Sequence, residues 1–261
     1  MILNNTMRLL DLSFREIEEL VKQCPGLIFP LGSLEPFGRT VPIGVPTFCC
    51  ESIAAAISSR LSVLLAPTFH FGCSTPFWSF TGCTGVKPAV MVNCLLDISK
   101  ALKIQGFKRI LMIDLSSSNQ DALIPFLKRV NSKEETVKVF SLHTDKSVRS
   151  FLSRSTGVDE PWRQEVVILS LAAYLGYPGL SSDTLSDSEI RADKEAFRRW
   201  FRTGKDPQKF RRLFPSGIIS SSFIRFSAGL GEDLFGFILE LLEKEYTSFL
   251  KSSCDDSKTD S

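Results

Sequence analysis

The side chain best placed for acid–base chemistry or metal binding in this sequence is the carboxylate of Glu35. It follows an apolar run, Leu27–Leu31, which predicts a buried strand, and the chain breaks at Gly32 into a loop that three prolines stiffen. A loop that leaves a strand and re-enters as a helix is where α/β proteins place their ligands. Glu35 is therefore a candidate general acid, base or metal ligand, and capping of backbone N–H groups is the competing role.

Polar side chains also follow the clearest buried strand of the sequence, which is predicted over residues 109–114. The turn after this strand offers hydroxyls and backbone N–H groups that could bind an anion such as phosphate or a carboxylate. Its residues are Ser116, Ser117, Ser118 and Asn119. Because a helix is predicted to follow directly, we also expect Ser118 or Asn119 to cap that helix.

Two further side chains are candidates for a pocket. Glu165 stands at the start of a predicted helix, where it could act as an acid or base with Glu35 or simply favour the positive end of the helix dipole. Trp78 lies in an irregular aromatic segment, residues 70–87, and could form the wall of a small-molecule pocket. Burial in the core or in a subunit contact is the alternative for this tryptophan.

Several common chemistries are excluded by the residues that the sequence lacks. Only two histidines occur, His70 and His143, so a mechanism that needs several imidazoles is not available. No nucleophile elbow, P-loop or dinucleotide-binding glycine motif is present. The seven cysteines include no CxxC pair. Although Cys49 and Cys50 open a predicted helix, where a thiolate would be favoured, we expect buried, reduced and inert thiols.

Composition indicates an ordinary cytoplasmic protein. Its 31 basic and 29 acidic residues nearly balance, so no overall field points to nucleic acid or membrane. No apolar run approaches the roughly 20 residues of a membrane span, and no secretory signal is recognised. We expect a single domain over residues 1–250 and a polar, disordered tail over residues 251–261. Residues 189–212 are basic and aromatic, and we favour an ordinary amphipathic helix there over a nucleic-acid or acidic-partner site.

Strands and helices alternate along the chain, which predicts a mostly parallel central sheet with right-handed crossovers, flanked by helices. Ser13 and Glu16 form a capping box at the first helix, and Thr47 is expected to cap the helix after the Glu35 loop. Strands are expected at residues 27–31, 62–66, 109–114 and 136–142, and the main helices at 47–60, 88–105, 164–175 and 226–250.

With these elements placed, the sequence resembles the creatininase (creatinine amidohydrolase) family over most of its length. Residues 32–46 resemble the family motif G-S-x-E-Q-H-G-P-H-L-P-x-G-T-D, residues 114–119 resemble N-G-H-G-G-N, and residues 71–74 resemble Y-G-x-S. Residues 160–166 stand where the family has H-A-G-x-x-E-T. The resemblance implies a three-layer α/β/α fold. It also implies an amidohydrolase that binds two divalent metals, usually zinc or manganese, and cleaves C–N bonds of small, often cyclic amides.

The same resemblance implies that most of the family's metal ligands are missing here. Glu35 keeps the first glutamate and Glu165 the late one. The family's other ligand positions, three histidines and a bridging aspartate, are occupied by Phe37, Pro46, Ser116 and Glu160. Because a hydrolytic zinc site needs about three protein ligands, we expect no cofactor beyond a weakly bound divalent metal at Glu35 and Glu165.

We therefore expect a divergent creatininase-family protein whose dinuclear metal centre is dismantled. The expected role is a non-catalytic or ligand-binding subunit of a homo-oligomer, or of a hetero-oligomer with a related subunit, with no membrane or nucleic-acid partner. A repurposed enzyme that uses Glu35 and Glu165 on a small amide or related metabolite is the first alternative, and a binding module at residues 189–212 is the second. The residues expected at a ligand pocket are Phe37, Ser74, Trp78, Ser116, Ser117, Ser118 and Asn119.

Overall fold

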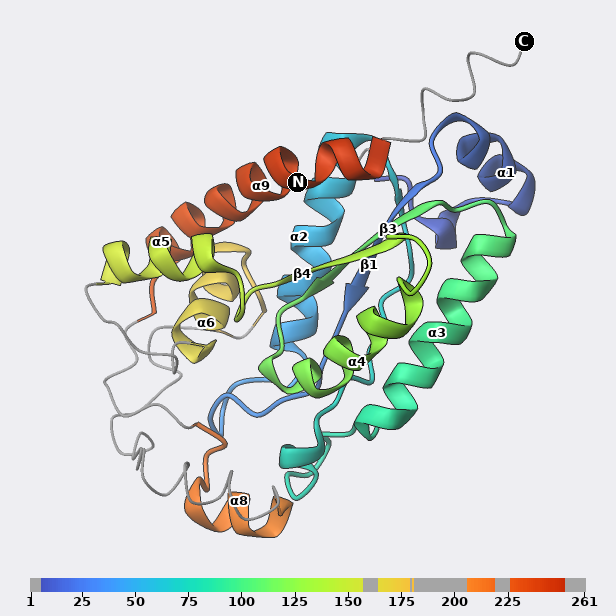
Figure 1. Cartoon of the computed structure of the whole chain (residues 1–261). Helices are drawn as coiled ribbons and strands as arrows, with labels where there is room; N and C mark the ends of the chain where they lie inside the picture. Colours follow the sequence, from blue (N-terminus) through green and yellow to red (C-terminus); the bar gives the residue numbers. More distant parts are fainter. Residues whose placement is uncertain (1–5, 157–163, 179, 181–205, 219–225, 252–261) are drawn as a thin grey trace.

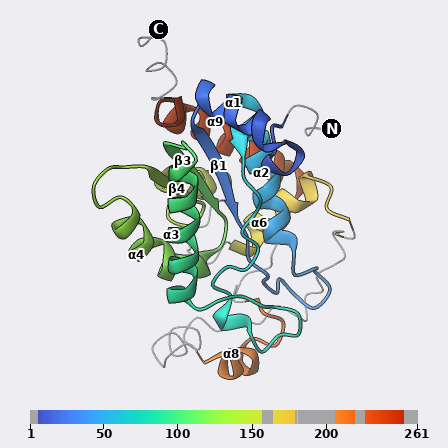
Figure 2. The ribbon, with the colours of Figure 1, turned by 90° about the vertical axis from the view of Figure 1, so that its right-hand side faces the viewer.

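The computed structural model describes residues 6–156, 164–178, 180, 206–218 and 226–251. In this part of the chain a parallel sheet lies between two layers of helices, and Figure 2 shows α4 and α2 on opposite sides of the strands. The sheet has the strand order β2-β1-β3-β4. Its strands are β1 (Gly26–Leu31), β2 (Leu64–Leu65), β3 (Arg109–Asp114) and β4 (Val137–Ser141).

Side chains along the strands alternate between two apolar clusters, one on each face of the sheet. In β3, Ile110 and Met112 belong to one cluster, and Leu111 and Ile113 belong to the other. The first cluster is covered by α1 (Phe14–Gln23), α3 (Pro88–Ile104) and α4 (Gln120–Val130). The second is covered by α2 (Val45–Leu61), α5 (Lys146–Thr156), α6 (Gln164–Tyr174) and α9 (Ala228–Lys251). The expected three-layer α/β/α fold is confirmed, and burial on both faces explains the apolar runs of the strands.

Most expected elements occur with small shifts at their ends. The capping box is present, since the Ser13 side chain accepts from the backbone N–H of Glu16 and the Glu16 carboxylate accepts from Ser13 in return. Strand β2 is shorter than expected because Ser62 ends α2 in the left-handed conformation, at φ 54°. Helix α5 was not predicted, because its two buried residues, Val148 and Leu152, are only one turn apart on a short and mostly polar segment.

Helix α2 begins at Val45, before the residue expected to cap it. Pro46 lies in the first turn, which suits its fixed φ and its missing N–H group. The Thr47 hydroxyl donates to the carbonyl of Ser33 at 2.9 Å and accepts from the Ser33 N–H at 3.3 Å. The prediction that Thr47 caps the helix is therefore wrong, because this hydroxyl ties the helix to the preceding loop.

Some expectations fall on residues that the structure does not describe. These are Glu160, most of the basic stretch (residues 189–205) and the tail from residue 252. The end of the basic stretch forms the short helix α8 (Pro207–Leu213). Within the described residues, no helix combines the length and the apolar character that a membrane span requires.

Candidate functional site

Glu35 is buried at the carboxyl end of the sheet, in the loop between β1 and α2, with 1% of its surface exposed. Its backbone N–H donates to the carbonyl of Ile43 at 3.1 Å, which closes the loop on itself. The loop is then held from the other side, because the N–H of Gly38 donates to the carbonyl of Ser216 at 3.1 Å. Backbone hydrogen bonds at Glu35 itself and at Gly38 therefore hold this loop, and with it the carboxylate, inside the protein.

The Ser116 hydroxyl donates a hydrogen bond to Oε1 of Glu35. The same hydroxyl oxygen accepts from the backbone N–H of Ser118 at 3.2 Å. The two loops meet because β1 and β3 are paired in parallel, so that their carboxyl ends lie at the same edge of the sheet. The structure thus brings together the loop carboxylate and the serine-rich turn, the two features that the sequence singled out.

A second buried carboxyl group, Asp114, lies beside this pair at the end of β3. Oδ1 of Asp114 accepts from the Asn119 amide at 2.8 Å and from the Ser116 N–H at 3.2 Å. Oδ2 accepts from the Gln120 amide at 3.0 Å and from the Ser141 hydroxyl at 3.2 Å. Sequence analysis did not select Asp114. The charged end of an otherwise apolar strand was the pattern that could have identified it.

Burial raises the pKa of Asp114 to about 7, and the nearby Glu35 carboxylate adds to the rise, although the hydrogen bonds from Asn119, Ser116 and Ser141 act in the opposite direction. Two acidic side chains therefore share one water-poor region, and one of them gains or loses its proton near neutral pH. Chemically, such an arrangement can bind hydrogen-bond donors or exchange a proton with a bound molecule.

Asn119 stands at the N-cap position of α4, but its side chain links three loops instead of bonding the first turn of the helix. Its Oδ1 accepts from the backbone N–H of Cys73 at 2.8 Å, and its Nδ2 lies 3.4 Å from the carbonyl of Gly32. The turn is capped by Ser116, whose hydroxyl accepts from Ser118. The prediction for Asn119 is therefore right in position, since Asn119 is the N-cap residue of α4, but its side chain makes no capping hydrogen bond because the buried amide satisfies groups from elsewhere in the fold.

The other expected pocket residues have different environments. Phe37 is 3% exposed and belongs to the apolar cluster shared with α2 and α6. Ser74 is fully buried, and its hydroxyl has no hydrogen-bond partner in the described part of the chain. Trp78 is 41% exposed and Ser117 is also exposed. Glu165 is 7% exposed in the first turn of α6, which packs against α2 and α9.

A small apolar cluster covers the loops at this end of the sheet. It consists of Phe77, Cys83, Phe210 and Phe214, and joins the aromatic segment to α8. Figure 1 shows the ribbon of α8 at this end of the molecule. Burial and the Glu35 carboxylate raise the pKa of the Cys83 thiol to about 11, so this thiol stays protonated. Burial likewise raises the pKa of Cys49 and Cys50 above the ordinary range, in agreement with inert thiols.

Neither histidine belongs to the carboxylate group around Glu35. His70 is exposed, with Nδ1 2.9 Å from the carbonyl of Thr68 and Nε2 3.5 Å from the Glu51 carboxylate. His143 Nε2 donates to the carbonyl of Leu115 at 2.7 Å, and burial lowers its pKa to about 4. A neutral imidazole with this partner holds the β4 end against the Ser116 turn.

The side chains at the family's ligand positions do not fit a dinuclear metal centre. Phe37 packs in the core, Pro46 lies in the first turn of α2, and the Ser116 hydroxyl donates a hydrogen bond to Glu35. Among the residues that the structure describes, no three His, Cys, Asp or Glu side chains converge as a set of metal ligands would. Because hydrolytic sites need about three such donors, these side chains do not make up the donor set of a hydrolytic metal site.

A family model described as "Creatininase: Creatinine amidohydrolase" matches residues 10–173. This match covers more than half of the chain, which therefore belongs to the creatininase family. Two solved structures agree in fold. The first is the crystal structure of creatinine amidohydrolase (creatininase), whose sequence is 17% identical to this chain. The match covers 93% of this chain and 99% of the creatininase chain, with a TM-score of 0.75. The second is a Glu-to-Gln mutant creatininase of the Zn-Zn type, whose sequence is 19% identical to this chain. The match covers 92% of this chain and 98% of the mutant creatininase chain, also with a TM-score of 0.75.

A curated relative is the 3-dehydro-scyllo-inosose hydrolase of Thermotoga maritima, which is 26% identical over 116 residues. The match covers 44% of this chain and 36% of the relative, so the chain corresponds to little more than a third of that protein's length. At these identities the solved structures establish the fold alone. The substrate in the name of the Thermotoga maritima protein is that protein's and is not transferred to this chain.

Proposed function

We propose that this chain is a creatininase-fold protein in which a hydrogen-bonded carboxylate network replaces the dinuclear metal centre, and that it acts as a non-catalytic, ligand-binding subunit of an oligomer. The observation that supports this proposal is the hydrogen bond from Ser116 to Glu35. By the family resemblance, these two positions hold metal ligands. Here a neutral hydroxyl donates to the carboxylate that would otherwise bind the ion.

The energetics of burial support the same proposal. A buried carboxylate is costly unless a cation or several hydrogen-bond donors compensate its charge. For Glu35 and Asp114, hydrogen-bond donors come from Ser116, Asn119, Gln120 and Ser141. A divalent ion would have to break this network, and would then meet the phenyl ring of Phe37 where an imidazole ligand is required.

Elemental analysis of the purified protein tests the proposal. The chain is produced with zinc and manganese in the medium, dialysed, and titrated with each ion by calorimetry. We expect far less than one ion per chain and no binding tighter than millimolar. The quadruple variant Phe37→His, Pro46→Asp, Ser116→His, Glu160→His restores all four missing ligand types of the family and serves as a positive control. About two tightly bound ions per wild-type chain would overturn the proposal.

A repurposed enzyme is the second candidate, and the raised pKa of Asp114 beside Glu35 favours it. General acids and bases work best when their pKa lies near the working pH. In this case wild-type protein treated with a chelator should still convert a small substrate. Creatinine and 3-dehydro-scyllo-inosose are the first probes, because relatives are named for them. Turnover by the wild type that is lost in Glu35→Gln, and kept in Ser117→Ala, would establish the enzyme.

A further inference from the structure

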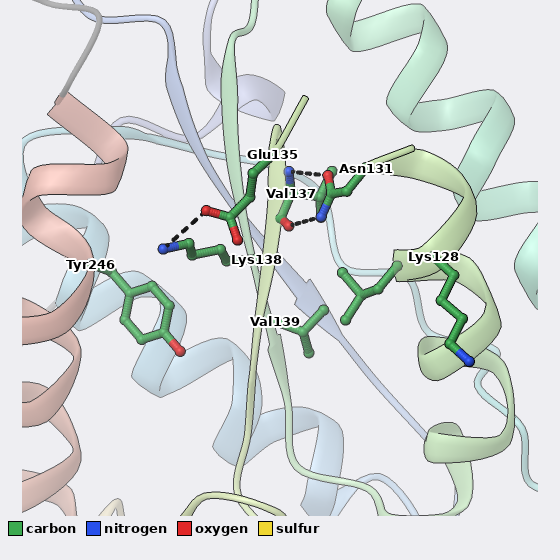
Figure 3. A pocket seen from close by; sticks show the side chains of 8 residues that line it. Lys128, Asn131, Glu135, Val137, Lys138, Val139 and Tyr246 are labelled. Carbon is green, nitrogen blue, oxygen red and sulfur yellow. Dashed lines mark hydrogen bonds and ion pairs between the residues drawn. The ribbon is translucent and has the colours of Figure 1, made fainter. Parts of the chain in front are cut away.

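Two surface hollows of this protein lie away from Glu35. A groove of about 520 Å³ runs along β4, and Figure 3 shows Lys128 of α4 and Tyr246 of α9 on its two sides. A second hollow, of about 310 Å³, lies between α3 and α4. Neither is lined by Glu35, which is 1% exposed, or by Ser116, which is equally buried. A ligand that reaches the Glu35 carboxylate therefore needs a local opening of the fold.

The part of the protein that packs on the Glu35 loop is the small apolar cluster at α8. Its members are Phe77, Cys83, Phe210 and Phe214, and they are separate from the two large clusters on the faces of the sheet. Ile43, whose carbonyl accepts from the Glu35 N–H, packs against this α8 cluster. Cys83 lies close to Glu35, since the Glu35 carboxylate adds to burial in raising the pKa of the Cys83 thiol. The α8 cluster therefore covers the carboxylate from outside the main core.

Phe210 is the buried centre of the contact between α8 and the aromatic segment. Its side chain is fully buried, and the centre of its ring lies 5.3 Å from that of Phe77 in an edge-on contact. The ring centres of Phe214 and Phe80 lie 5.0 and 6.2 Å away. The closed position of α8 thus depends strongly on one aromatic side chain.

Polar contacts hold the outer side of α8 to the same segment. The Ser79 hydroxyl donates to the Pro207 carbonyl at 2.7 Å, and the Arg211 guanidinium donates to the Ser79 carbonyl. The guanidinium carbon also lies 5.3 Å from the centre of the Phe80 ring. Arg211 is exposed, and exposed contacts of these kinds are individually weak. They can break and re-form without disturbing the core.

The aromatic segment is the fixed half of this contact. The N–H of Cys73 donates to the Asn119 side chain at 2.8 Å, and Cys73 itself is buried in the large cluster that α3 covers. At the other end of the segment, the N–H of Val86 donates to the Gly72 carbonyl at 3.0 Å. Both ends of the loop that carries Phe77 and Cys83 are thus tied to the sheet side of the site, so α8 is the half that can move.

The turn after α8 has the features of a pivot. The Ser216 carbonyl accepts from the N–H of Gly38, and Ile218 is buried in the large cluster that α2 covers. Between them, Gly217 has a φ of +80°, and a Cβ at this position would meet the ring of Pro36 at 2.5 Å. Residues 216–218 therefore stay on the Glu35 loop while the helix before them is held by its own small cluster.

We propose that α8 is a cap that opens about residues 216–218 and admits a ligand to Glu35, with Phe210 setting the balance between closed and open forms. The cap rests on the ligand-binding role proposed above. Opening separates Phe210 and Phe214 from the aromatic segment and uncovers Cys83. Because the α8 cluster is small, this step exposes far less apolar surface than unfolding of the whole chain, and segments with few buried contacts open at lower free energy than the core. Site-covering lids commonly turn about a few residues at the end of an element.

The thiol of Cys83 reports the opening without any ligand. Cys83 is 3% exposed beneath α8, and Cys73, at 2% exposed in the large cluster, is the internal reference. The wild-type protein is treated with iodoacetamide, and the alkylation of each cysteine is followed by mass spectrometry. We expect Cys83 to react at least tenfold faster than Cys73. Its rate should also depend less on urea, because the cap exposes less surface than global unfolding does.

The substitution Phe210→Ala shifts the cap toward its open form. Alkylation of Cys83 should become about tenfold faster or more, while that of Cys73 stays within about twofold. Leu213→Ala is the matched control, since Leu213 lies on α8, is 36% exposed and is outside the α8 cluster. It should leave both rates within about twofold. If Phe210→Ala does not fold, Ser79→Ala removes the hydrogen bond to Pro207 and should speed the reaction of Cys83 about fivefold.

Two results would overturn the cap. One is alkylation of Cys83 and Cys73 at equal rates with equal urea dependence, which means that both thiols are reached only by global unfolding. The other is an unchanged Cys83 rate in folded Phe210→Ala or Ser79→Ala. The metal analysis of the same preparations is a separate measurement. Two tightly bound ions would overturn the proposed function and leave the alkylation rates to decide whether α8 opens.

Discussion

Asp114 should make the fold less stable as the pH rises. Its pKa is about 7 in the folded protein and 3.8 as an ordinary aspartate. Because the folded state holds the proton more tightly, this contribution is fully present below pH 3.8 and is lost as the pH rises through 7. The difference of about three pKa units corresponds to about 4 kcal/mol, of which about 3 kcal/mol falls between pH 5 and 8.5.

The substitution Asp114→Asn isolates this effect. Asparagine keeps an acceptor for Ser116 and Asn119, and its amide can donate to the Ser141 hydroxyl if the Gln120 amide turns its oxygen inward. Free energies of unfolding by urea are measured for both proteins from pH 5 to 8.5. Titrating groups common to both proteins cancel, so the unfolding free energy of the wild type minus that of the variant should fall by about 3 kcal/mol across this range. A difference that stays constant within about 0.5 kcal/mol would refute the reasoning, because the four donors would then keep Asp114 ionised throughout.

Three further predictions concern hydrogen bonding, acid stability and backbone conformation. Ser116→Ala leaves a buried carboxylate without its hydroxyl donor and should lower the unfolding free energy by about 1–3 kcal/mol, whereas Ser117→Ala, on the exposed side of the turn, should change it by less than about 0.5 kcal/mol. His143→Gln should reduce the loss of stability between pH 6.5 and 4, because the lowered pKa makes the folded state resist protonation there; equal acid midpoints in a pH titration of unfolding would contradict this. Gly217→Ala should destabilise the fold by more than about 1 kcal/mol, since φ is +80° and an added Cβ would meet a proline ring at 2.5 Å. Gly236→Ala in α9 is the matched control: an added Cβ there meets nothing within 4 Å, so the substitution should stabilise the fold by about 0.5–1 kcal/mol. Thermal unfolding measures both effects.

The elements that were easiest to predict are those whose side chains meet a single environment. Strands β1 and β3 are buried on both faces, so they appear in the sequence as unbroken apolar runs. Helix α9 is long enough for its apolar face to repeat several times. Helix α5 repeats that face only once, which is too short a pattern to recognise against a polar background.

The candidate site was predictable in place and much less so in detail. Loops after neighbouring parallel strands must meet, so a contact between the Glu35 loop and the Ser116 turn follows from the strand order. Which group donates to which does not follow, because side-chain direction depends on packing. Thr47 and Asn119 were both expected to act locally as helix caps, and both instead bond groups distant in the sequence.

By itself, the sequence determined a parallel α/β sheet through its apolar periodicity. Through its resemblance to the family's motifs it also implied the creatininase fold and the loss of the usual ligand types, because periodicity, motifs and residue identity are local properties of the chain. Phenylalanine and proline cannot donate to a metal in any conformation. Only the tertiary structure decided how the polar side chains around Glu35 are arranged. Asp114, Ser116, Asn119 and Glu35 come together from two strand ends, and burial, which no single segment encodes, sets their hydrogen bonds and the raised pKa of Asp114.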